Sequence, residues 1–198
     1  MVREPEQGSA REHILERLLA VCDGVPPSPD QSMRQLASML GTTHGLLRYH
    51  FGSYEGLLAA MLAEQRKRDN LELNELCADL GFRESVEAVW GLYGQPEQQD
   101  RFRAFFYVAA RAAYNPSAFT EFLLTQYDLY GLFVASALRE GADSSSAESA
   151  ALMTIATIRG LIFARILGRA LPADDQVTKG IMGAAAGFLP SPSRSRRA

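Results

Sequence analysis

The side chains best suited to binding chemistry gather between Ser32 and Phe51, in the run SMRQLASMLGTTHGLLRYHF. Hydroxyls, guanidinium groups and imidazoles lie close together there, and such groups donate hydrogen bonds to phosphates and base edges. The candidate DNA contacts are nine residues of this run, together with Tyr54, which lies just beyond it. The nine are Ser32, Arg34, Thr42, Thr43, His44, Leu46, Arg48, Tyr49 and His50.

Two short helices joined by a tight turn are expected to position these groups. They cover about 33–40 and 44–51, and Gly41 supplies the positive φ at which a helix ends sharply. Ser32 can cap the first helix in a capping box, and Thr43 can cap the second. This pattern predicts a helix-turn-helix, whose second helix lies in the DNA major groove. A plain helical hairpin inside a core is the alternative.

The run GTTHGLLRYHFGSYEGLLAAM resembles the signature of the TetR family of bacterial transcriptional regulators. That pattern has a glycine, a capping Ser or Thr, a second glycine, Leu-Tyr-x-His-Phe, x-Ser-Lys-Glu and a leucine-rich helix. The matching residues are Gly41, Thr43, Gly45, Leu47, His50, Phe51, Ser53, Glu55, Leu57 and Leu58. The resemblance covers about residues 10–65. It implies an all-α, nine-helix fold with an N-terminal three-helix head and a C-terminal helical domain for ligand binding and dimerisation.

Two positions depart from the family pattern. Arg48 stands where the family has tyrosine, with Tyr49 one place later, and Tyr54 stands where the family has lysine. The Arg48 guanidinium can hold a phosphate by charge. Tyr54 offers only a neutral hydrogen bond, so one expected phosphate cation is missing.

The charge balance of the chain counts against non-specific DNA binding. The 198 residues are 47% hydrophobic and 22% charged, as in ordinary globular proteins, and the formal net charge is −3. Residues 1–60 carry five arginines against seven carboxylates. Because Lys and Arg supply most non-specific affinity, DNA binding requires Arg34, Arg48 and His50 to share one surface, with the acids turned away.

Catalytic and metal-binding groups show no productive spacing. Cys22 and Cys77 lack a metal-ligand pattern, which favours buried thiols in a reducing cytosol. His44 and His50 are six residues apart and do not share a helix face. We therefore expect no metal, no cofactor and no enzymatic activity, with a helical enzyme as a distant alternative.

No membrane partner is expected, and the predicted location is the bacterial cytoplasm. The N-terminal run MVREPEQGSAREH lacks the apolar stretch of a signal peptide. The most apolar long run, 150–171, contains three arginines, which favours a soluble helix over a membrane span.

Helical periodicity covers nearly the whole chain. The nine expected helices lie at about 9–23, 33–40, 44–51, 53–80, 84–92, 97–114, 117–140, 147–170 and 174–189. The predicted domains are a DNA-binding head (1–52), a connector helix (53–80), a regulatory and dimerisation domain (81–189) and a disordered basic tail (190–198). A shift of the connector helix would move the head.

Aromatic side chains are concentrated in the regulatory domain. Aromatic stripes at helical spacing usually form a core, whereas the resemblance favours a pocket for a small apolar or aromatic effector. The candidate ligand contacts are Trp90, Phe102, Phe105, Phe106, Arg111, Phe122, Gln126, Tyr130 and Arg159.

The last two predicted helices have the pattern of a dimer surface. Glycine inside a helix costs about 1 kcal/mol relative to alanine, so the glycines of the last helix indicate the close approach of another backbone. The candidate interface residues are Ala151, Thr154, Ile158, Ile162, Gly180, Gly183, Ala184 and Gly187. The resemblance implies a four-helix bundle made by two subunits.

These features predict a ligand-responsive homodimeric regulator that binds double-stranded DNA. The family resemblance implies repression, with release from a palindromic operator when a small apolar or aromatic effector binds. The alternative is a helical adaptor or ligand-binding protein of the same fold without DNA binding, which the acidic head and Tyr54 support.

Overall fold

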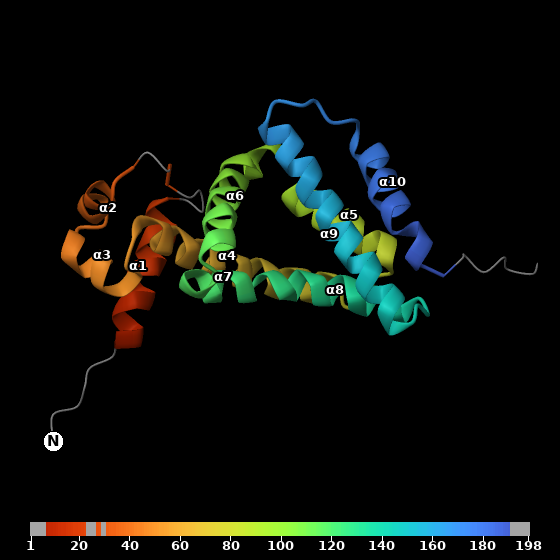
Figure 1. Cartoon of the computed structure of the whole chain (residues 1–198), viewed down its shortest axis with the longest axis horizontal. Helices are drawn as coiled ribbons and strands as arrows, with labels where there is room; N and C mark the ends of the chain where they lie inside the picture. Colours follow the sequence, from red (N-terminus) through yellow and green to blue (C-terminus); the bar gives the residue numbers. More distant parts are fainter. Residues whose placement is uncertain (1–6, 23–26, 29–30, 191–198) are drawn as a thin grey trace, which may run out of the picture. The chain divides into compact units, whose positions relative to one another are not determined.

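The computed structural model describes residues 7–22, 27–28 and 31–190, and every regular element within these ranges is a helix (Figure 1). The α-helices are α1 (Gln7–Val21), α2 (Met33–Met39), α3 (His44–Phe51), α4 (Tyr54–Leu76), α5 (Phe82–Tyr93), α6 (Gln99–Tyr114), α7 (Thr120–Leu124), α8 (Gln126–Arg139), α9 (Ser144–Ile166) and α10 (Asp174–Ala185). Three 3-10 helices are η1 (Pro96–Gln98), η2 (Pro116–Phe119) and η3 (Ala186–Phe188). The all-α prediction is confirmed.

The described residues form ten α-helices, where nine were predicted, because the helix expected over 117–140 is interrupted. It is replaced by η2, α7 and α8. Thr125 ends α7, and its Oγ1 donates a hydrogen bond to the Phe122 carbonyl at 2.8 Å. Side-chain to backbone bonds of this kind compete with regular helical geometry.

The chain divides into two compact units, which we describe separately. The first draws on Met1–Asp69 and Gln99–Thr125, and the second on Asn70–Gln98 and Gln126–Ala198. Helix α4 supplies residues to both units. This division by contacts differs from the ranges expected from the sequence, because α6, η2 and α7 group with the first helices. The functional boundaries at 52, 80 and 189 stay a prediction.

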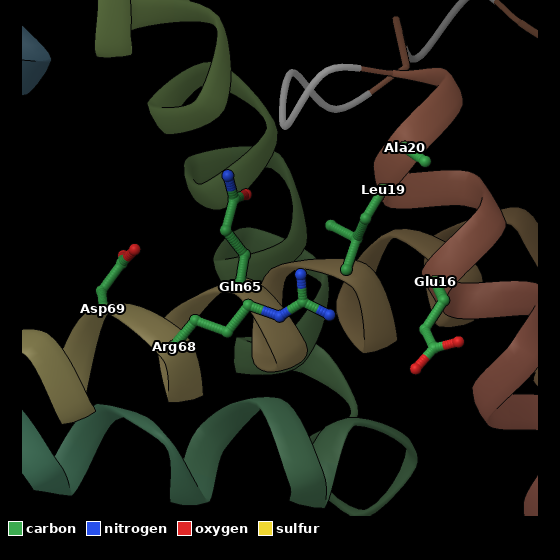
Figure 2. A pocket seen from close by; sticks show the side chains of 6 residues that line it. All are labelled: Glu16, Leu19, Ala20, Gln65, Arg68 and Asp69. Carbon is green, nitrogen blue, oxygen red and sulfur yellow. The ribbon is translucent and has the colours of Figure 1, made fainter.

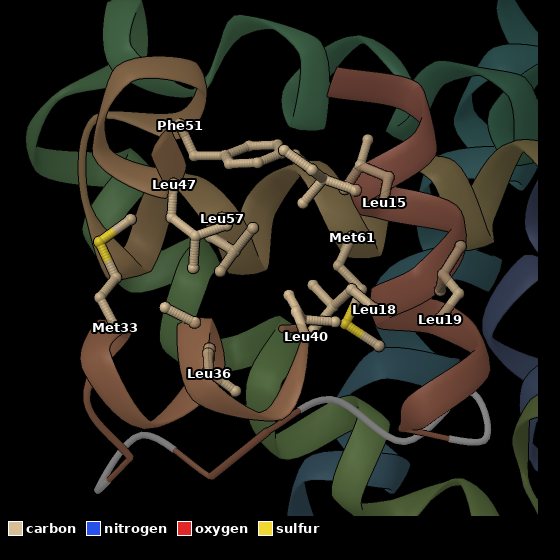
Figure 3. Packing of buried hydrophobic residues seen from close by; sticks show 13 residues of the cluster. Leu15, Leu18, Leu19, Met33, Leu36, Leu40, Leu47, Phe51, Leu57 and Met61 are labelled. Atoms are coloured by element: carbon tan, nitrogen blue, oxygen red, sulfur yellow. The ribbon is translucent and has the colours of Figure 1, made fainter. Parts of the chain in front are cut away.

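A leucine-rich core holds α1, α2, α3 and the start of α4 together (Figure 3). Leu36 of α2 and Leu47 of α3 are fully buried in it, together with Leu57 and Met61 of α4. Burying one such side chain contributes about 2 kcal/mol, so this cluster fixes how α2 and α3 pack. We call α1–α3 and residues 54–61 the head.

In the second unit, α9 packs against α8 and α10, and α5 packs against the same two helices. The Phe82 and Phe133 rings lie 5.7 Å apart between α5 and α8. The Trp90 indole Nε1 donates a hydrogen bond to Asp174 Oδ1 at 3.0 Å, which ties α5 to the start of α10. Each helix of this unit therefore has an apolar face covered by a neighbour.

Candidate nucleic-acid interface

Helix α2 begins with the predicted capping box. The Ser32 hydroxyl accepts a hydrogen bond from the Gln35 backbone N–H at 3.3 Å, and Gln35 Oε1 accepts one from the Ser32 N–H at 2.7 Å. Both donors would otherwise lack a helical partner. The capping box confirms where the first helix of the motif starts.

The turn between α2 and α3 is also as predicted. Gly41 adopts a φ of 57°, in the left-handed region that favours glycine. The Thr42 N–H then donates to the Ala37 carbonyl at 2.9 Å, which closes the end of α2. Thr43 is extended, and its Oγ1 accepts a hydrogen bond from the Leu46 N–H at 3.2 Å. The described residues therefore contain a capped helix-turn-helix.

The outward side of α3 carries much of the predicted DNA-contact set. Leu47 and Phe51 point into the head core, and at 100° per residue Gly45 and Tyr49 lie on the opposite side of the helix. The predicted contacts that are exposed are Ser32, Arg34, Thr43, Leu46, Arg48 and Tyr49, and those that are half-buried are Thr42, His44 and His50. The motif thus presents a continuous solvent-facing surface at α3.

Tyr54 has a different environment from the one predicted. Its hydroxyl donates a hydrogen bond to the Ser28 carbonyl and lies 3.2 Å from the Pro27 carbonyl, and the residue is half-buried. A tyrosine hydroxyl has one proton to donate. This internal bond disfavours the phosphate contact predicted for Tyr54 and assigns it to holding the segment before α2.

The first turn of α4 leaves no space for a side chain at Gly56. Gly52, with a φ of 72°, follows α3, and Ser53 Oγ accepts a hydrogen bond from the Gly56 N–H at 3.1 Å. A Cβ atom at Gly56 would lie 2.2 Å from the Phe51 carbonyl oxygen. The first turn of α4 therefore lies directly against the end of α3.

Helix α6 contacts the head at Glu55. The Tyr107 hydroxyl donates to Glu55 Oε1 at 3.2 Å, and Arg111 Nη2 lies 3.8 Å from the same oxygen. A backbone hydrogen bond at Glu55, followed by bonds from Ser53 and Tyr107 and the Arg111 charge, holds the pKa of Glu55 below its usual value despite the opposing effect of burial. Arg111, predicted to contact a ligand, is exposed and pairs with this carboxylate.

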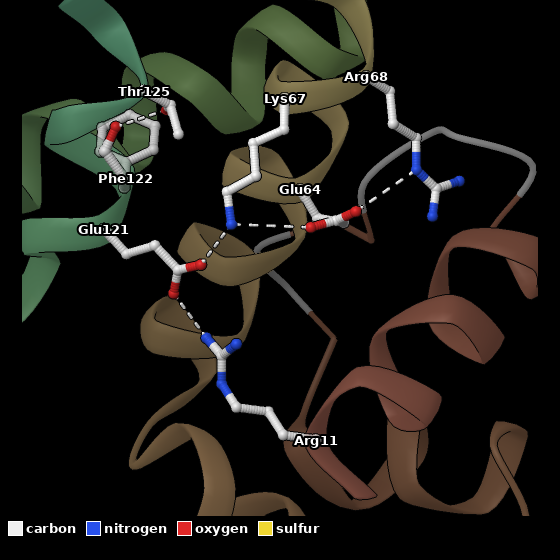
Figure 4. Close-up of polar contacts among 7 residues, drawn as sticks. All are labelled: Arg11, Glu64, Lys67, Arg68, Glu121, Phe122 and Thr125. Carbon is white, nitrogen blue, oxygen red and sulfur yellow. Dashed lines mark hydrogen bonds and ion pairs between the residues drawn. The ribbon is translucent and has the colours of Figure 1, made fainter. Parts of the chain in front are cut away.

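Helix α7 contacts the head through Glu121 (Figure 4). Its two carboxylate oxygens lie 2.7 Å from Arg11 Nη2 of α1 and 3.0 Å from Lys67 Nζ of α4. A cavity of about 190 Å³ adjoins this bridge and reaches α3 at His50 and Phe51. The first unit therefore joins α6 and α7 to the head by polar contacts on two sides.

A broader groove lies between α1 and α4 in the first unit (Figure 2). Its volume is about 560 Å³, and its lining residues are Glu16, Leu19, Ala20, Gln65, Arg68 and Asp69. Asp69 forms an ion pair with the buried Arg101, and Arg68 lies 3.6 Å from Glu64. Arg68 and Asp69 therefore have charged partners within the unit, which favours a solvated surface.

The predicted ligand contacts fall into two groups. Phe102, Phe105, Phe106 and Phe122 belong to the first unit, where Phe105 lies 5.2 Å from Phe106 and 5.6 Å from Phe122 between ring centroids. Phe102, Phe105 and Phe122 are buried, and Phe106 is half-buried. Such aromatic packing is typical of a core, so the core interpretation holds for this group.

Trp90, Gln126, Tyr130 and Arg159 of the predicted ligand contacts belong to the second unit. Arg159 Nη2 donates to Gln126 Oε1 at 2.9 Å, and Tyr130 is half-buried. Trp90 is buried, with its Nε1 bonded to Asp174 and the Arg165 guanidinium 5.5 Å from its ring centroid. Trp90 is therefore a core residue whose polar atom has an internal partner.

The predicted dimer residues also divide into two sets. Ala151, Thr154, Ile158 and Ile162 of α9 are buried inside the protomer, so they do not form an exposed face. The prediction that these four residues form the dimer surface was wrong, because α9 is apolar over a wide arc. Periodicity alone does not show which side of such a helix the protomer's own core covers. The exposed apolar residues of the same helix are Leu152, Met153, Ala156, Gly160 and Phe163.

The glycines of the last helical segment face open space. Gly180, Gly183 and Gly187 are exposed, and within the described part of the chain no heavy atom lies within 4 Å of where their Cβ would be. Ala184 is half-buried. These glycines leave room for another backbone to approach closely.

Other classes of site find little support in the described residues. No group of three or more His, Cys, Asp or Glu side chains within these ranges has the geometry of a metal site. Cys77 is buried, Cys22 is half-buried, and burial raises the pKa of both thiols. One described helix, α9, is long and apolar enough to cross a membrane, and one third of its most apolar window is buried inside the protein.

No family model and no curated protein sequence matches this chain. Solved structures match it over most of its length. A Mesorhizobium loti protein assigned to the TetR family of transcriptional regulators is 11% identical with a TM-score of 0.64, and the match covers 92% of this chain and 97% of that one. A TetR transcriptional regulator from Legionella pneumophila is 15% identical with a TM-score of 0.57, covering 95% and 100%.

The multidrug binding protein EbrR, solved in complex with imidazole, is 16% identical with a TM-score of 0.63, and the match covers 98% of this chain and 100% of that one. At these identities the likeness concerns the fold. The capped helix-turn-helix and the all-helical architecture agree with it, and the resemblance found in the sequence is confirmed at that level. This chain has the fold of the TetR-family transcriptional regulators.

Proposed function

We propose that this protein is a ligand-responsive homodimeric DNA-binding transcriptional regulator, and specifically a repressor that a small apolar or aromatic effector releases from a palindromic operator. The observation that carries the proposal is α3 itself. It is capped by Thr43, packed through Leu47 and exposed along Gly45, Arg48 and Tyr49. A helix presented in this way fits the DNA major groove.

The dimer is the second part of the proposal. One short helix reads few base pairs, whereas two heads related by a dyad read two half-sites about 34–36 Å apart. The exposed apolar side of α9, including Leu152 and Phe163, and the open glycines Gly180 and Gly183 of α10 support a helical interface with close backbone approach. A corresponding pair of helices from a second subunit completes a four-helix bundle.

Effector response is the third part. The bonds from Tyr107 and Arg111 to Glu55, and from Arg11 and Lys67 to Glu121, join α6 and α7 to the head. An effector that binds more tightly to one arrangement of these helices would raise the fraction of protein in that arrangement. If that arrangement places the heads wrongly for the operator, DNA affinity falls. The imidazole complex of EbrR, a protein of similar fold, supports a small-molecule effector.

The test is fluorescence anisotropy with the full-length protein and duplexes from its own upstream DNA. We expect saturable binding at low salt that weakens as salt rises, with one dimer bound per palindrome by analytical ultracentrifugation. If the folded dimer at low salt has the same affinity for every upstream duplex as for a scrambled duplex, the regulator proposal is wrong.

An adaptor without DNA binding is the second candidate, and the excess of carboxylates over arginines in residues 1–60 favours it. The two candidates differ in what Arg48→Ala does. A regulator loses DNA affinity, while an adaptor that never binds DNA shows no change in any duplex assay.

A further inference from the structure

The centre of the outward face of α3 is unusually apolar for a surface that meets a polyanion. Leu46 is 41% exposed and Tyr49 is 67% exposed. Gly45, which lies one turn before Tyr49 on the same side, adds no side chain, and the nearest atom to its absent Cβ is Thr43 Oγ1 at 3.9 Å. Base edges can therefore come close to the helix backbone at Gly45, beside Leu46 and Tyr49.

Helix α3 also carries few of the side chains that most often pair with base edges, and its two imidazoles, His44 and His50, are half-buried. The residues HGLLRYHF include no Asn or Gln to pair with adenine and no Asp or Glu to accept from cytosine. Arg48 is its one guanidinium, at the flank of the exposed face. Leu46 has no donor or acceptor, so a polar base edge packed against it would lose hydrogen bonds to water without replacement.

One group in the major groove matches an apolar surface, and that is the C5 methyl of thymine. Leucine and the tyrosine ring both pack well against a methyl group. We infer that α3 reads its half-site through thymine methyls held by Leu46 and Tyr49, with Arg48 on a neighbouring guanine or phosphate. The operator half-site then contains adjacent A·T pairs whose thymines face these two side chains. The inference rests on the proposed function, because it requires α3 in the major groove.

The experiment removes single methyl groups from the DNA. Operator duplexes are first recovered by selection from a random library with the full-length protein. Each thymine of the half-site is then replaced by deoxyuridine, which lacks the methyl and pairs identically with adenine. We expect one or two positions per half-site at which affinity falls about fourfold, the value for burying one methyl-sized group, and no change at other thymines.

Variants assign each methyl to a side chain. With Leu46→Ala, the difference between thymine and deoxyuridine is expected to vanish at one sensitive position, and with Tyr49→Ala at the other. Leu71→Ala removes an apolar side chain of α4 that is 68% exposed and serves as the control, with affinity and methyl sensitivity expected to stay unchanged. Because the deoxyuridine series itself uses the unaltered protein, it does not depend on any variant folding.

The outcomes separate the two proposals. Specific binding with equal affinity for thymine and deoxyuridine at every position overturns methyl reading and leaves the regulator intact. A selected half-site without A·T pairs does the same. Failure of the selection to enrich any duplex overturns both the inference and the proposed function.

Discussion

The Arg11 guanidinium of α1 and the Glu121 carboxylate of α7 form an ion pair with 2.7 Å between Nη2 and Oε2, although 110 residues separate them. The Arg11 guanidinium also lies 5.4 Å from the centroid of the Phe51 ring, at the end of α3. The Arg11 side chain therefore contacts both α3 and α7 within the first unit.

The stability conferred by Glu121 should depend on pH. Burial raises the pKa of this carboxyl, but hydrogen bonds and charges from Lys67 and Arg11 outweigh burial, so the net shift is downward. A depressed pKa means that the contribution is present above the unfolded value and is lost as pH falls through the folded one. Because the side chains are partly exposed, Glu121→Gln should cost less than about 1 kcal/mol near neutral pH.

Urea unfolding from about pH 7 to pH 3 measures this effect, since glutamate titrates near pH 4.3 when unfolded. The difference between Glu121→Gln and the parent should shrink towards the acid end. Glu97→Gln changes an exposed glutamate of η1 and is the control. A difference that grows on acidification would contradict the assigned partners.

Tyr54→Phe separates an internal role from a DNA contact. The hydroxyl bond to the Ser28 carbonyl lies within the head, so its loss should cost about 1 kcal/mol of unfolding free energy and leave DNA affinity unchanged. Tyr114, which is 93% exposed, provides the control Tyr114→Phe with neither effect. Weaker DNA binding by Tyr54→Phe at unchanged stability would restore the phosphate contact predicted from the sequence.

Arg48→Ala should weaken operator binding by roughly 1–3 kcal/mol, or about 5- to 160-fold. If Arg48 contacts a phosphate, the slope of log affinity against log salt should also fall by about 0.9. Anisotropy titrations at several salt concentrations measure both quantities. Arg83→Ala, an exposed arginine of α5, should change neither of them.

Gly180→Leu tests the interface proposed for α10. A leucine there meets open space within the protomer, so the monomer should fold, while a close backbone approach by a partner would be blocked. Sedimentation velocity should show a shift from dimer to monomer, together with weaker binding to a palindrome. Gly131→Leu on α8, another exposed glycine with open space around it, is the control. A fully dimeric Gly180→Leu would move the interface elsewhere.

Thr154→Val should stabilise the protein. Thr154 is fully buried on α9, and its hydroxyl has no hydrogen-bond partner among the described residues. Replacing it by a methyl of similar size removes a desolvation cost of about 1 kcal/mol or more. Thermal unfolding measures the gain. Thr157→Val, whose hydroxyl donates to the Met153 carbonyl at 2.7 Å, should give no gain.

Local features of the head could be predicted from the sequence because their causes are local. Ser32, Gln35, Gly41 and Thr43 each act on backbone groups within a few residues, and the structure has them in the expected roles. Leu36 and Leu47, one on each helix of the motif, are buried in the head core. The caps and the turn depend on helix geometry and on hydrogen bonds between residues close in sequence, so a short stretch of chain is enough to predict them.

Tertiary choices could not be predicted in the same way. Helix α9 is apolar on more than one side, so only its neighbours α8 and α10 decide that Thr154 is buried and Leu152 is exposed. The hydroxyl of Tyr54 finds a carbonyl 26 residues earlier in the chain, which no spacing rule reveals. The break at Thr125 depends on a side-chain bond that competes with a continuous helix.

The bare backbone at Gly56 has a mechanical consequence. Since a Cβ atom at Gly56 would lie 2.2 Å from the Phe51 carbonyl oxygen, the first turn of α4 cannot move closer to the last turn of α3 without a clash. A displacement of α4 towards α3 would therefore push α3, the helix proposed to contact DNA, and a side chain at position 56 would force these two turns apart.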